Sequence, residues 1–239
     1  MKETKTLGIL GGIGPLASVY FADLVVNMTD AEKDQEHLPL FMYNDVYIPD
    51  RTDFILGKSD TNPLPFIIEG LRVLEKVGCD YAAMTCNTAH YFYDEIQENV
   101  SIPVVNIVET AVEYVKEQIP AVKKIGVLAT DGTVKSGVYE KVIKKHGLEC
   151  EVPSDENQKE VMNIIYNQVK AGNKVNLYGF MNIVEELREK GCDAIILGCT
   201  ELSVINKDFN LSMESHDIID AMQALARKCI TLCGKKIKE

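Results

Sequence analysis

The sequence predicts an α/β protein made of two similar halves, and three observations support this. Short apolar runs, which are typical of buried strands, alternate along the chain with amphipathic segments of helical spacing. A nine-residue segment that begins at Gly78 (GCDYAAMTC) occurs again from Gly191 (GCDAIILGC). A weaker repeat relates Lys5–Leu10 (KTLGIL) to Lys124–Leu128 (KIGVL) in the same order. Strands that alternate with helices of about 10 to 15 residues indicate parallel sheets with helices on both faces.

The first half is expected to begin with a strand and a glycine-rich turn. Apolar runs predict strands at Thr6–Leu10, Leu40–Val46, Tyr81–Met84 and Val104–Ile107. The turn at Gly11–Pro15 leads into a helix. Helical spacing predicts a further helix over Pro63–Val77, which Gly78 ends, and another that runs through Glu113.

The second half repeats this alternation. Strands are predicted at Lys124–Ala129, Glu149–Val152 and Ala194–Leu197, and helices at Gly137–Lys145, Gln158–Lys170, Leu177–Lys190 and Asp217–Cys233. Pro120 and Lys123 interrupt the pattern between the halves. We therefore expect an N-terminal subdomain over residues 1–118 and a C-terminal subdomain over 119–216. The last helix, about 217–239, is expected to pack back on the first subdomain.

The composition excludes several classes of function. The chain has 239 residues, with 25 Lys and Arg against 36 Asp and Glu, and a formal net charge of −11. Nucleic acids and anionic membranes require clustered Lys and Arg, so neither partner is expected. The seven cysteines lack the spacing of a disulfide scaffold, which favours a reducing compartment. The uncharged stretch Thr6–Ala22 contains five glycine or proline residues and is no apolar helix, so we expect a cytoplasmic protein.

The longer repeat places two cysteines at equivalent positions. Cys86 and Cys199 each follow a predicted buried strand, and in both copies the next residues are polar and begin a helical pattern. Ligands of open parallel sheets bind outside the carboxyl ends of the strands, where helix N–H groups favour anions. A thiol in such a place is expected to have a pKa below its ordinary value of about 8.5.

Two thiols that face one cleft suit a particular reaction. Inversion of a stereocentre requires a base on one face of the carbon and an acid on the other, and two thiols can exchange these roles. If the halves pack face to face, Cys86 and Cys199 reach the cleft from opposite sides. The helix-terminal N–H groups and the hydroxyls of Thr88 and Thr200 are then expected to bind the substrate α-carboxylate and to stabilise the developing carbanion.

Three motifs resemble those of the aspartate/glutamate racemase family, and within it those of aspartate racemases. They are GGIGP at residues 11–15, MTCNTAH at 84–90 and LGCTEL at 197–202. The resemblance runs along essentially the whole chain. It implies two α/β subdomains related by pseudo-twofold symmetry, often in a homodimer. It also implies amino-acid racemisation without pyridoxal phosphate or metal, so no cofactor is expected. Ile13 stands where a methionine is common, which is an apolar exchange.

Carried over residue by residue, the resemblance assigns Cys86 and Cys199 to the two acid/base cysteines of the family. Asn87, Thr88 and Thr200 match positions that hold the α-amino and α-carboxylate groups of the substrate. Because both cysteines are present, the resemblance favours racemisation over the one-cysteine decarboxylases of the wider superfamily.

The resemblance adds four further residues to the predicted substrate-binding set. Thr130 matches a threonine that follows the strand opening the second half, and Glu201 follows the second cysteine motif's threonine. Arg51, in IPDRT, and Lys170, in VKAG, match positions near the active site of aspartate racemases. Arg can bind a second carboxylate bidentately and Lys as a point charge, so an acidic amino acid is the expected substrate. Aspartate is the first candidate and glutamate the second.

Three alternatives remain beside the racemase. A cis–trans isomerase of a dicarboxylate such as maleate uses the same two cysteines, one of which adds to the double bond. A non-catalytic dicarboxylate-binding protein fits the same two-lobed scaffold. A zinc-dependent hydrolase draws on His90, four residues after Cys86, but the chain has only four His and no second Cys–His pair. His90 is therefore expected to pack or hydrogen-bond near the helix start. The turn Gly11–Gly14 lacks the dinucleotide pattern Gly-x-Gly-x-x-Gly.

Overall fold

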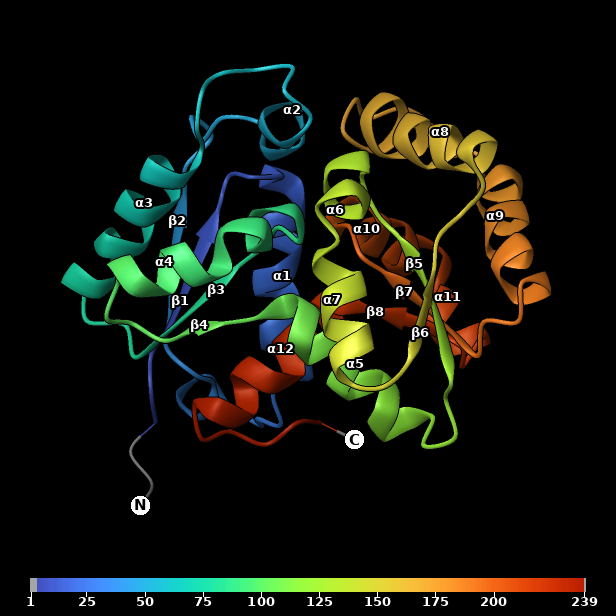
Figure 1. Cartoon of the computed structure of the whole chain (residues 1–239). Coiled ribbons are helices and arrows are strands. Elements are labelled where there is room, and N and C mark those ends of the chain that lie inside the picture. Colours follow the sequence, from blue (N-terminus) through green and yellow to red (C-terminus); the bar gives the residue numbers. More distant parts are fainter. Residues whose placement is uncertain (1–3, 239) are drawn as a thin grey trace.

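Two four-stranded sheets form the centre of the computed structural model, which describes residues 4–238 (Figure 1). The strands are β1 (Leu7–Gly11), β2 (Leu40–Asn44), β3 (Tyr81–Met84), β4 (Val104–Val105), β5 (Lys124–Leu128), β6 (Glu149–Glu151), β7 (Ala194–Leu197) and β8 (Ile218–Asp220). The first sheet has the order β2-β1-β3-β4 and the second β6-β5-β7-β8, and all neighbouring strands are parallel. The predicted α/β class with two parallel sheets is confirmed, and the sequence repeat corresponds to a repeated topology.

The central strands of the two sheets end at equivalent places. Every residue of β1 and β7 is buried, as expected for parallel strands covered on both faces by helices. Met84 of β3 lies opposite Leu10, and Leu197 of β7 lies opposite Leu128. β3 and β7 therefore end at equivalent positions in their sheets, two residues before Cys86 and Cys199.

Helices cover both sheets. In the first half they are α1 (Pro15–Met28), a 3₁₀ turn η1 (Asp34–Glu36), α2 (Arg51–Ile55), α3 (Leu64–Lys76), a 3₁₀ turn η2 (Thr88–Phe92), α4 (Tyr93–Asn99) and α5 (Ile107–Gln118). In the second half they are α6 (Asp131–Ser136), α7 (Val138–Lys145), α8 (Asp155–Asn163), a π-helical segment η3 (Ile164–Val169), α9 (Leu177–Glu189), α10 (Thr200–Phe209), α11 (Leu211–Glu214) and α12 (Ala221–Leu232). Side chains cap several N-termini: Asn106 caps α5, Thr130 caps α6, and Asp220 caps α12.

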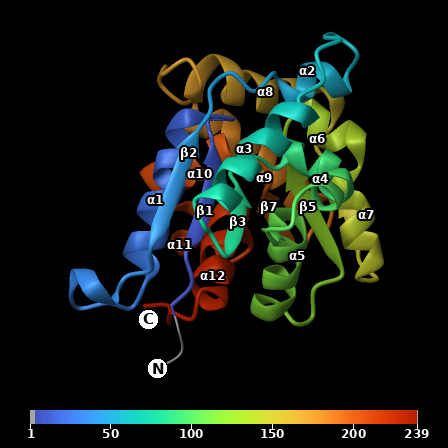
Figure 2. The same cartoon turned by 90° about the vertical axis from the view of Figure 1, so that its left-hand side faces the viewer.

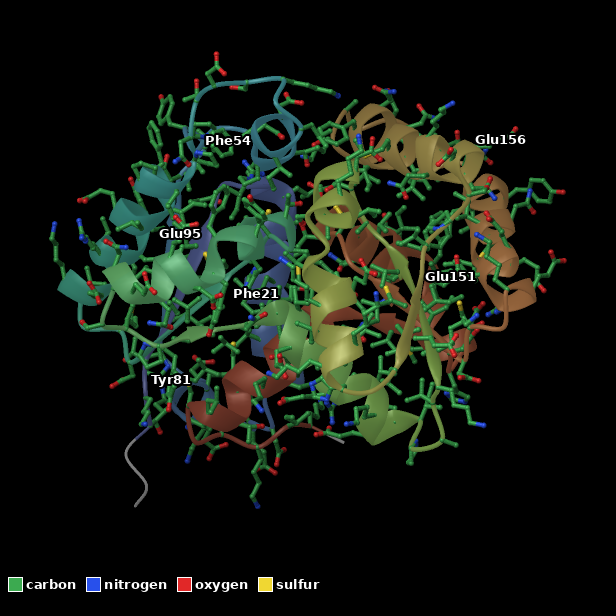
Figure 3. All side chains as sticks on the ribbon, viewed as in Figure 1. Phe21, Phe54, Tyr81, Glu95, Glu151 and Glu156 are labelled. Atoms are coloured by element: carbon green, nitrogen blue, oxygen red, sulfur yellow. The ribbon has the colours of Figure 1, made fainter. Side chains whose placement is uncertain are left out.

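The two halves share one hydrophobic core. A single buried cluster contains Ile9 and Ala83 of the first sheet together with Val127 and Ile196 of the second. Each sheet has a further cluster on its other face. Figure 3 shows Phe21 inside the molecule, whereas Glu95 and Glu156 lie at its outer surface. The burial of both inner faces in one cluster joins the halves firmly.

The C-terminal helix crosses from the second sheet to the first half. α12 follows β8, yet it packs against α1, α5, β3 and β4. Both views place α12 beside α5 (Figures 1 and 2). The predicted boundary between the subdomains stays a prediction. Among the helices within residues 4–238, none combines the length and the apolar composition that crossing a bilayer requires.

Several element boundaries differ from the prediction. The helix predicted from Asp217 is wrong at its start, because Ile218–Asp220 forms β8 and pairs with β7. The apolar residues of β8 continue the helical pattern of α12, so only the tertiary pairing separates them. The strand predicted over Val104–Ile107 is shorter, since Ile107 begins α5. The predicted helix Gln158–Lys170 begins earlier, at Asp155, and changes to a π-helix at Ile164.

Candidate active site

A small cavity lies between the two halves, beyond the carboxyl ends of β3 and β7. The residues that line it are Ile13, Arg51, Thr52, Cys86, Asn87, Thr88, Thr130, Tyr166, Lys170, Cys199, Thr200 and Glu201. All nine residues predicted from the sequence for this site are therefore brought together, and both thiols line the same space. The cavity volume is about 20 Å³, which holds roughly one water molecule.

A larger pocket adjoins the cavity on its outer side. Its volume is about 410 Å³, and Arg51, Lys170 and Glu201 line both spaces. Its apolar walls are Pro15, Leu16, Ala17, Val46, Ile48, Val169 and Val204. Gly14 lies at its edge with φ of 118°, a left-handed conformation that glycine adopts readily, and lets the chain turn sharply into α1. Three charged side chains thus separate the cavity from an open, largely apolar vestibule.

Cys199 is held beside a carboxylate. The residue is the N-cap of α10 and is 7% exposed, and its Sγ donates a hydrogen bond to Oε2 of Glu201 at 2.9 Å. Lys170 lies on the other side of this carboxylate, with its Nζ 3.9 Å from Oε1 of Glu201. Burial raises the pKa of the Cys199 thiol well above its ordinary value, and the charge of Glu201 adds to this. The lower pKa predicted from the helix start is therefore wrong for Cys199, because burial and the carboxylate outweigh the helix N-terminus.

Cys86 has a cation beside it instead. The guanidinium of Arg51 is buried, and its Nη1 donates to the carbonyl oxygens of Pro49 at 2.9 Å and Ile48 at 3.4 Å. Burial lowers the pKa of Arg51, but Cys86 and Asp50 next to it raise it by more, so the net shift is upward. Cys86 therefore lies beside a buried cation, whereas Cys199 lies beside a carboxylate.

Two buried donors of the cavity lining have no acceptor among the described residues. They are Nε of Arg51 and Nδ2 of Asn87. Asn87 is 2% exposed, and its Oδ1 accepts a hydrogen bond from the Tyr139 hydroxyl at 2.7 Å, which fixes the orientation of the amide. A buried donor without a partner costs about 1–3 kcal/mol. The lining is thus prepared for a ligand that supplies acceptor oxygens.

A cluster of threonine hydroxyls joins the halves at the cavity. The Thr130 hydroxyl lies 3.1 Å from that of Thr88 and accepts from Thr52 at 3.2 Å, while Thr133 lies 2.8 Å from Thr88. A Cβ atom on Gly132 would lie 2.8 Å from Cα of Thr52, so glycine is required for this close approach. The cluster fixes the position of Thr88 and Thr130 relative to one another.

Three lining residues were not among the predicted site residues: Ile13, which belongs to the glycine-rich motif, and Thr52 and Tyr166. Tyr166 lies on the π-helical segment η3, where its hydroxyl contacts Oδ2 of Asp50 at 3.4 Å and its ring lies 4.3 Å from Nζ of Lys170. A π-helix inside a longer helix is a frequent mark of a functional site, but no sequence pattern announces it. Thr52 directly follows Arg51, so its position beside a predicted site residue was the available signal.

His90, the histidine with zinc-site spacing, does not point a free nitrogen at the cavity. Its Nδ1 lies 2.9 Å from the carbonyl oxygen of Cys86, and its Nε2 lies 3.3 Å from the backbone N of Ile107. Within residues 4–238, no three His, Cys, Asp or Glu side chains are grouped so that they could hold a metal ion. The chemistry of the lining is that of thiols, hydroxyls and fixed charges.

Comparison with known proteins identifies relatives along nearly the whole chain. The family model described as Asp/Glu/Hydantoin racemase matches residues 10–229. The broad specificity amino-acid racemase RacX of Bacillus subtilis (strain 168) is 30% identical over 229 residues, which is 94% of this chain and 96% of RacX. The structure of Picrophilus torridus aspartate racemase has a TM-score of 0.83 at 32% identity, covering 98% of this chain and 96% of that one. An aspartate racemase homologue from Pyrococcus horikoshii OT3 has a TM-score of 0.76 at 25% identity, covering 96% and 99%.

Proposed function

The chain belongs to the Asp/Glu/Hydantoin racemase family, and from this premise we propose that it racemises an acidic amino acid, with aspartate as the first candidate. Cys86 and Cys199 act as the two acid/base groups, without pyridoxal phosphate or metal. One observation carries the proposal: both thiols line a single cavity whose buried donors on Arg51 and Asn87 lack an acceptor. A carboxylate of the substrate supplies the acceptor oxygens.

The charges beside the thiols support a division of roles in one direction of the reaction. Cys86, next to the cation of Arg51, acts as the base that removes the Cα proton, and the electron pair of the C–H bond becomes the carbanion. Cys199, which donates to Glu201, is the thiol that returns a proton to the opposite face. Once the product has formed, Cys86 is a thiol and Cys199 is a thiolate. This form of the enzyme accepts the other enantiomer. Lys170 stabilises the second form, because it lies beside Glu201 and offsets part of its charge.

The remaining lining residues bind and orient the substrate. The hydroxyl of Thr88, fixed by the threonine cluster around Thr130, and that of Thr200 at the start of α10 bind the α-carboxylate together with Nδ2 of Asn87. Arg51 and Lys170 bind the side-chain carboxylate. Glu201 offers an acceptor to the α-ammonium group when Lys170 turns to the substrate.

The cavity has to enlarge when the substrate binds. Its volume of about 20 Å³ is far below that of an amino acid, whereas the vestibule of about 410 Å³ is accessible. Arg51, Lys170 and Glu201 line both spaces, so movement of these three side chains opens the path. The charged substrate replaces the Lys170–Glu201 contact that closes it.

A second candidate substrate class is non-acidic amino acids. The vestibule walls include Leu16, Val46 and Val204, which suit an apolar side chain that extends past Arg51. The broad specificity amino-acid racemase RacX is a relative over nearly the whole chain. Under this candidate the reaction and both cysteines are the same, and only the side-chain contacts differ.

Proton NMR in D₂O tests the proposal directly. L-Aspartate, L-glutamate and L-leucine are each incubated with reduced protein and chelator, and loss of the Cα–H signal is followed beside chiral separation of the product. Exchange with formation of D-aspartate is expected; exchange of leucine at a comparable rate selects the second candidate. Cys86→Ala and Cys199→Ala are expected to abolish inversion, whereas Cys192→Ala, a buried cysteine outside the cavity, retains it. No exchange of any amino acid refutes the racemase, and maleate turnover in the same assay selects the isomerase.

A further inference from the structure

In both halves, the residue four positions after Cys86 or Cys199 connects the cysteine to the helix that follows the last strand of the sheet. After Cys86 this residue is His90, whose ring lies between the Cys86 carbonyl and the backbone N–H of Ile107, the first residue of α5. The four-residue spacing relates Ser203 to Cys199 in the second half. The two halves thus use different side chains to connect the cysteine to this helix. The proposed racemase function requires such a connection in both halves.

The connection through His90 fixes the tautomer of its ring. The Cys86 carbonyl can only accept, so Nδ1 of His90 carries the hydrogen, at 2.9 Å from the oxygen. The Ile107 N–H can only donate, so Nε2 accepts at 3.3 Å. His90 is 5% exposed, and the ring of Tyr93 stacks on it with centroids 5.8 Å apart and planes at 10°. The ring is thus held as a neutral spacer between the cysteine loop and α5.

The second connection runs through a buried carboxylate. The backbone N–H of Ser203 lies 3.4 Å from the Cys199 carbonyl, and its hydroxyl donates to Oδ1 of Asp220 at 2.6 Å. Asp220 is 1% exposed and is the N-cap of α12, where Oδ1 accepts from the N–H of Met222 at 2.9 Å. Oδ2 accepts from Asn206 at 2.9 Å, so both carboxylate oxygens are engaged.

The two target helices pack against each other. α5 and α12 are in direct contact, and Figure 2 shows them side by side. Their contact faces belong to the core shared by the two halves, with Val108, Val112 and Leu225 fully or almost fully buried. A continuous chain of contacts therefore joins one cysteine to the other, through His90, the α5–α12 pair and Asp220, at the side of the molecule away from the vestibule.

We propose that His90 and Asp220 are positioning residues that fix the two thiols to the α5–α12 pair, and that this helix pair sets the spacing between the thiols. The inference rests on the proposed function, because two-base inversion requires both thiols at fixed places on opposite faces of one carbon. A displacement of about 1 Å in such a geometry can cost on the order of 100-fold in rate. Neither residue lines the cavity or the vestibule, so substrate binding is expected to be spared.

The test compares two substitutions of His90. His90→Leu fills the space but removes both hydrogen bonds, and it is expected to lower kcat for aspartate by roughly 10- to 100-fold with little change in KM. His90→Gln can donate from Nε2 to the Cys86 carbonyl and accept at Oε1 from Ile107, so it is expected to restore most of kcat. His216→Leu, at an exposed histidine, is the matched control and is expected to leave kcat unchanged. Wild-type kcat in His90→Leu overturns the proposal, as does an equal loss in His90→Gln with an unaltered fold.

A second readout separates positioning from general destabilisation. If only Cys86 is displaced, Cys199 still exchanges the Cα proton on its own face. In His90→Leu, deuterium exchange that occurs without inversion is then expected to increase relative to inversion for one enantiomer. Asp220→Asn is expected to raise this ratio for the other enantiomer. A merely structural role lowers exchange and inversion in proportion for both enantiomers, and that result overturns the proposal.

A third readout does not depend on racemisation. The rate of Cys86 alkylation by iodoacetamide is measured in the Cys199→Ala background, with and without His90→Leu, and ¹⁵N NMR of the wild type reports the His90 tautomer. A changed alkylation rate and an Nδ1–H tautomer support the positioning role even if the wild type racemises no amino acid, which would refute the proposed function alone. An unchanged rate or an Nε2–H tautomer overturns the inference. If His90→Leu fails to fold, the tautomer and the His90→Gln kinetics decide it.

Discussion

Acidification from pH 7 to pH 4 is expected to destabilise the protein through His90. Burial lowers the pKa of this imidazole from 6.5 to about 4, and backbone hydrogen bonding, chiefly to the Cys86 carbonyl, only partly opposes this. The unfolded chain takes up a proton at this side chain below about pH 6.5, whereas the folded chain does so only near pH 4. The contribution of the neutral His90 to stability is therefore fully present above about pH 6.5 and is lost as the pH falls toward 4.

The size of the effect follows from the two pKa values. They differ by about 2.5, and each unit corresponds to about 1.36 kcal/mol, so His90 contributes a loss of about 3 kcal/mol in the free energy of unfolding at pH 4. His90→Gln has no titrating ring and is expected to lose about 3 kcal/mol less over the same range. This difference is a large part of the 5–15 kcal/mol typical of a folded protein.

Urea denaturation at pH 7, 5.5 and 4 measures both proteins. Carboxylates also weaken the fold in acid: hydrogen bonds and the charge of Lys190 hold the pKa of Glu186 at about 2 against the opposing effect of burial. That contribution is the same in both proteins and cancels in the difference. Parallel pH curves for the wild type and His90→Gln would refute the assignment of a neutral, buried His90.

Three further predictions concern the cavity. Glu201→Gln is expected to move the alkaline limb of the kcat profile to lower pH, because the carboxylate that helps to raise the pKa of the Cys199 thiol is gone; an unmoved limb in a pH–rate series would contradict this. Arg51→Gln is expected to raise KM for aspartate by at least about 10-fold and to affect leucine less, which steady-state kinetics with both substrates checks. Gly132→Ala is expected to lower the free energy of unfolding, measured in urea, by about 1–3 kcal/mol, because its Cβ would lie 2.8 Å from Cα of Thr52. An unchanged free energy of unfolding would contradict the need for this close approach.

The repeated segments and the buried apolar strands of the fold could be predicted from the sequence. The copies at Gly78 and Gly191 predict two equivalent strands, and β3 and β7 indeed occupy equivalent places in the two sheets. The polar residues that follow each strand predict the lining residues, because parallel strands end at one edge of their sheet. Periodicity could not find β8, whose three residues continue the pattern of α12 and become a strand only by pairing with β7.

The electrostatics of the thiols could not be predicted in the same way. The helix start beside Cys199 predicts a lower pKa, but burial of the thiol and the nearby Glu201 carboxylate raise the pKa instead. Both effects depend on the three-dimensional enclosure, which residue order does not contain. Tyr166 lies in the lining for a similar reason, since it reaches Asp50 of the other half across a large distance in sequence.

The unequal surroundings of the two cysteines suit the proposed two-base mechanism. Two identical thiols in identical surroundings would share one pKa, and the form with one thiolate and one thiol would compete with the doubly protonated and doubly ionised forms. Here the surroundings differ, because Cys86 lies beside the cation of Arg51, whereas burial and the charge of Glu201 raise the pKa of the Cys199 thiol. Under the proposed mechanism, the repeated fold brings both thiols to one cavity, and their unequal neighbours suit one thiol as the base and the other as the acid in each direction.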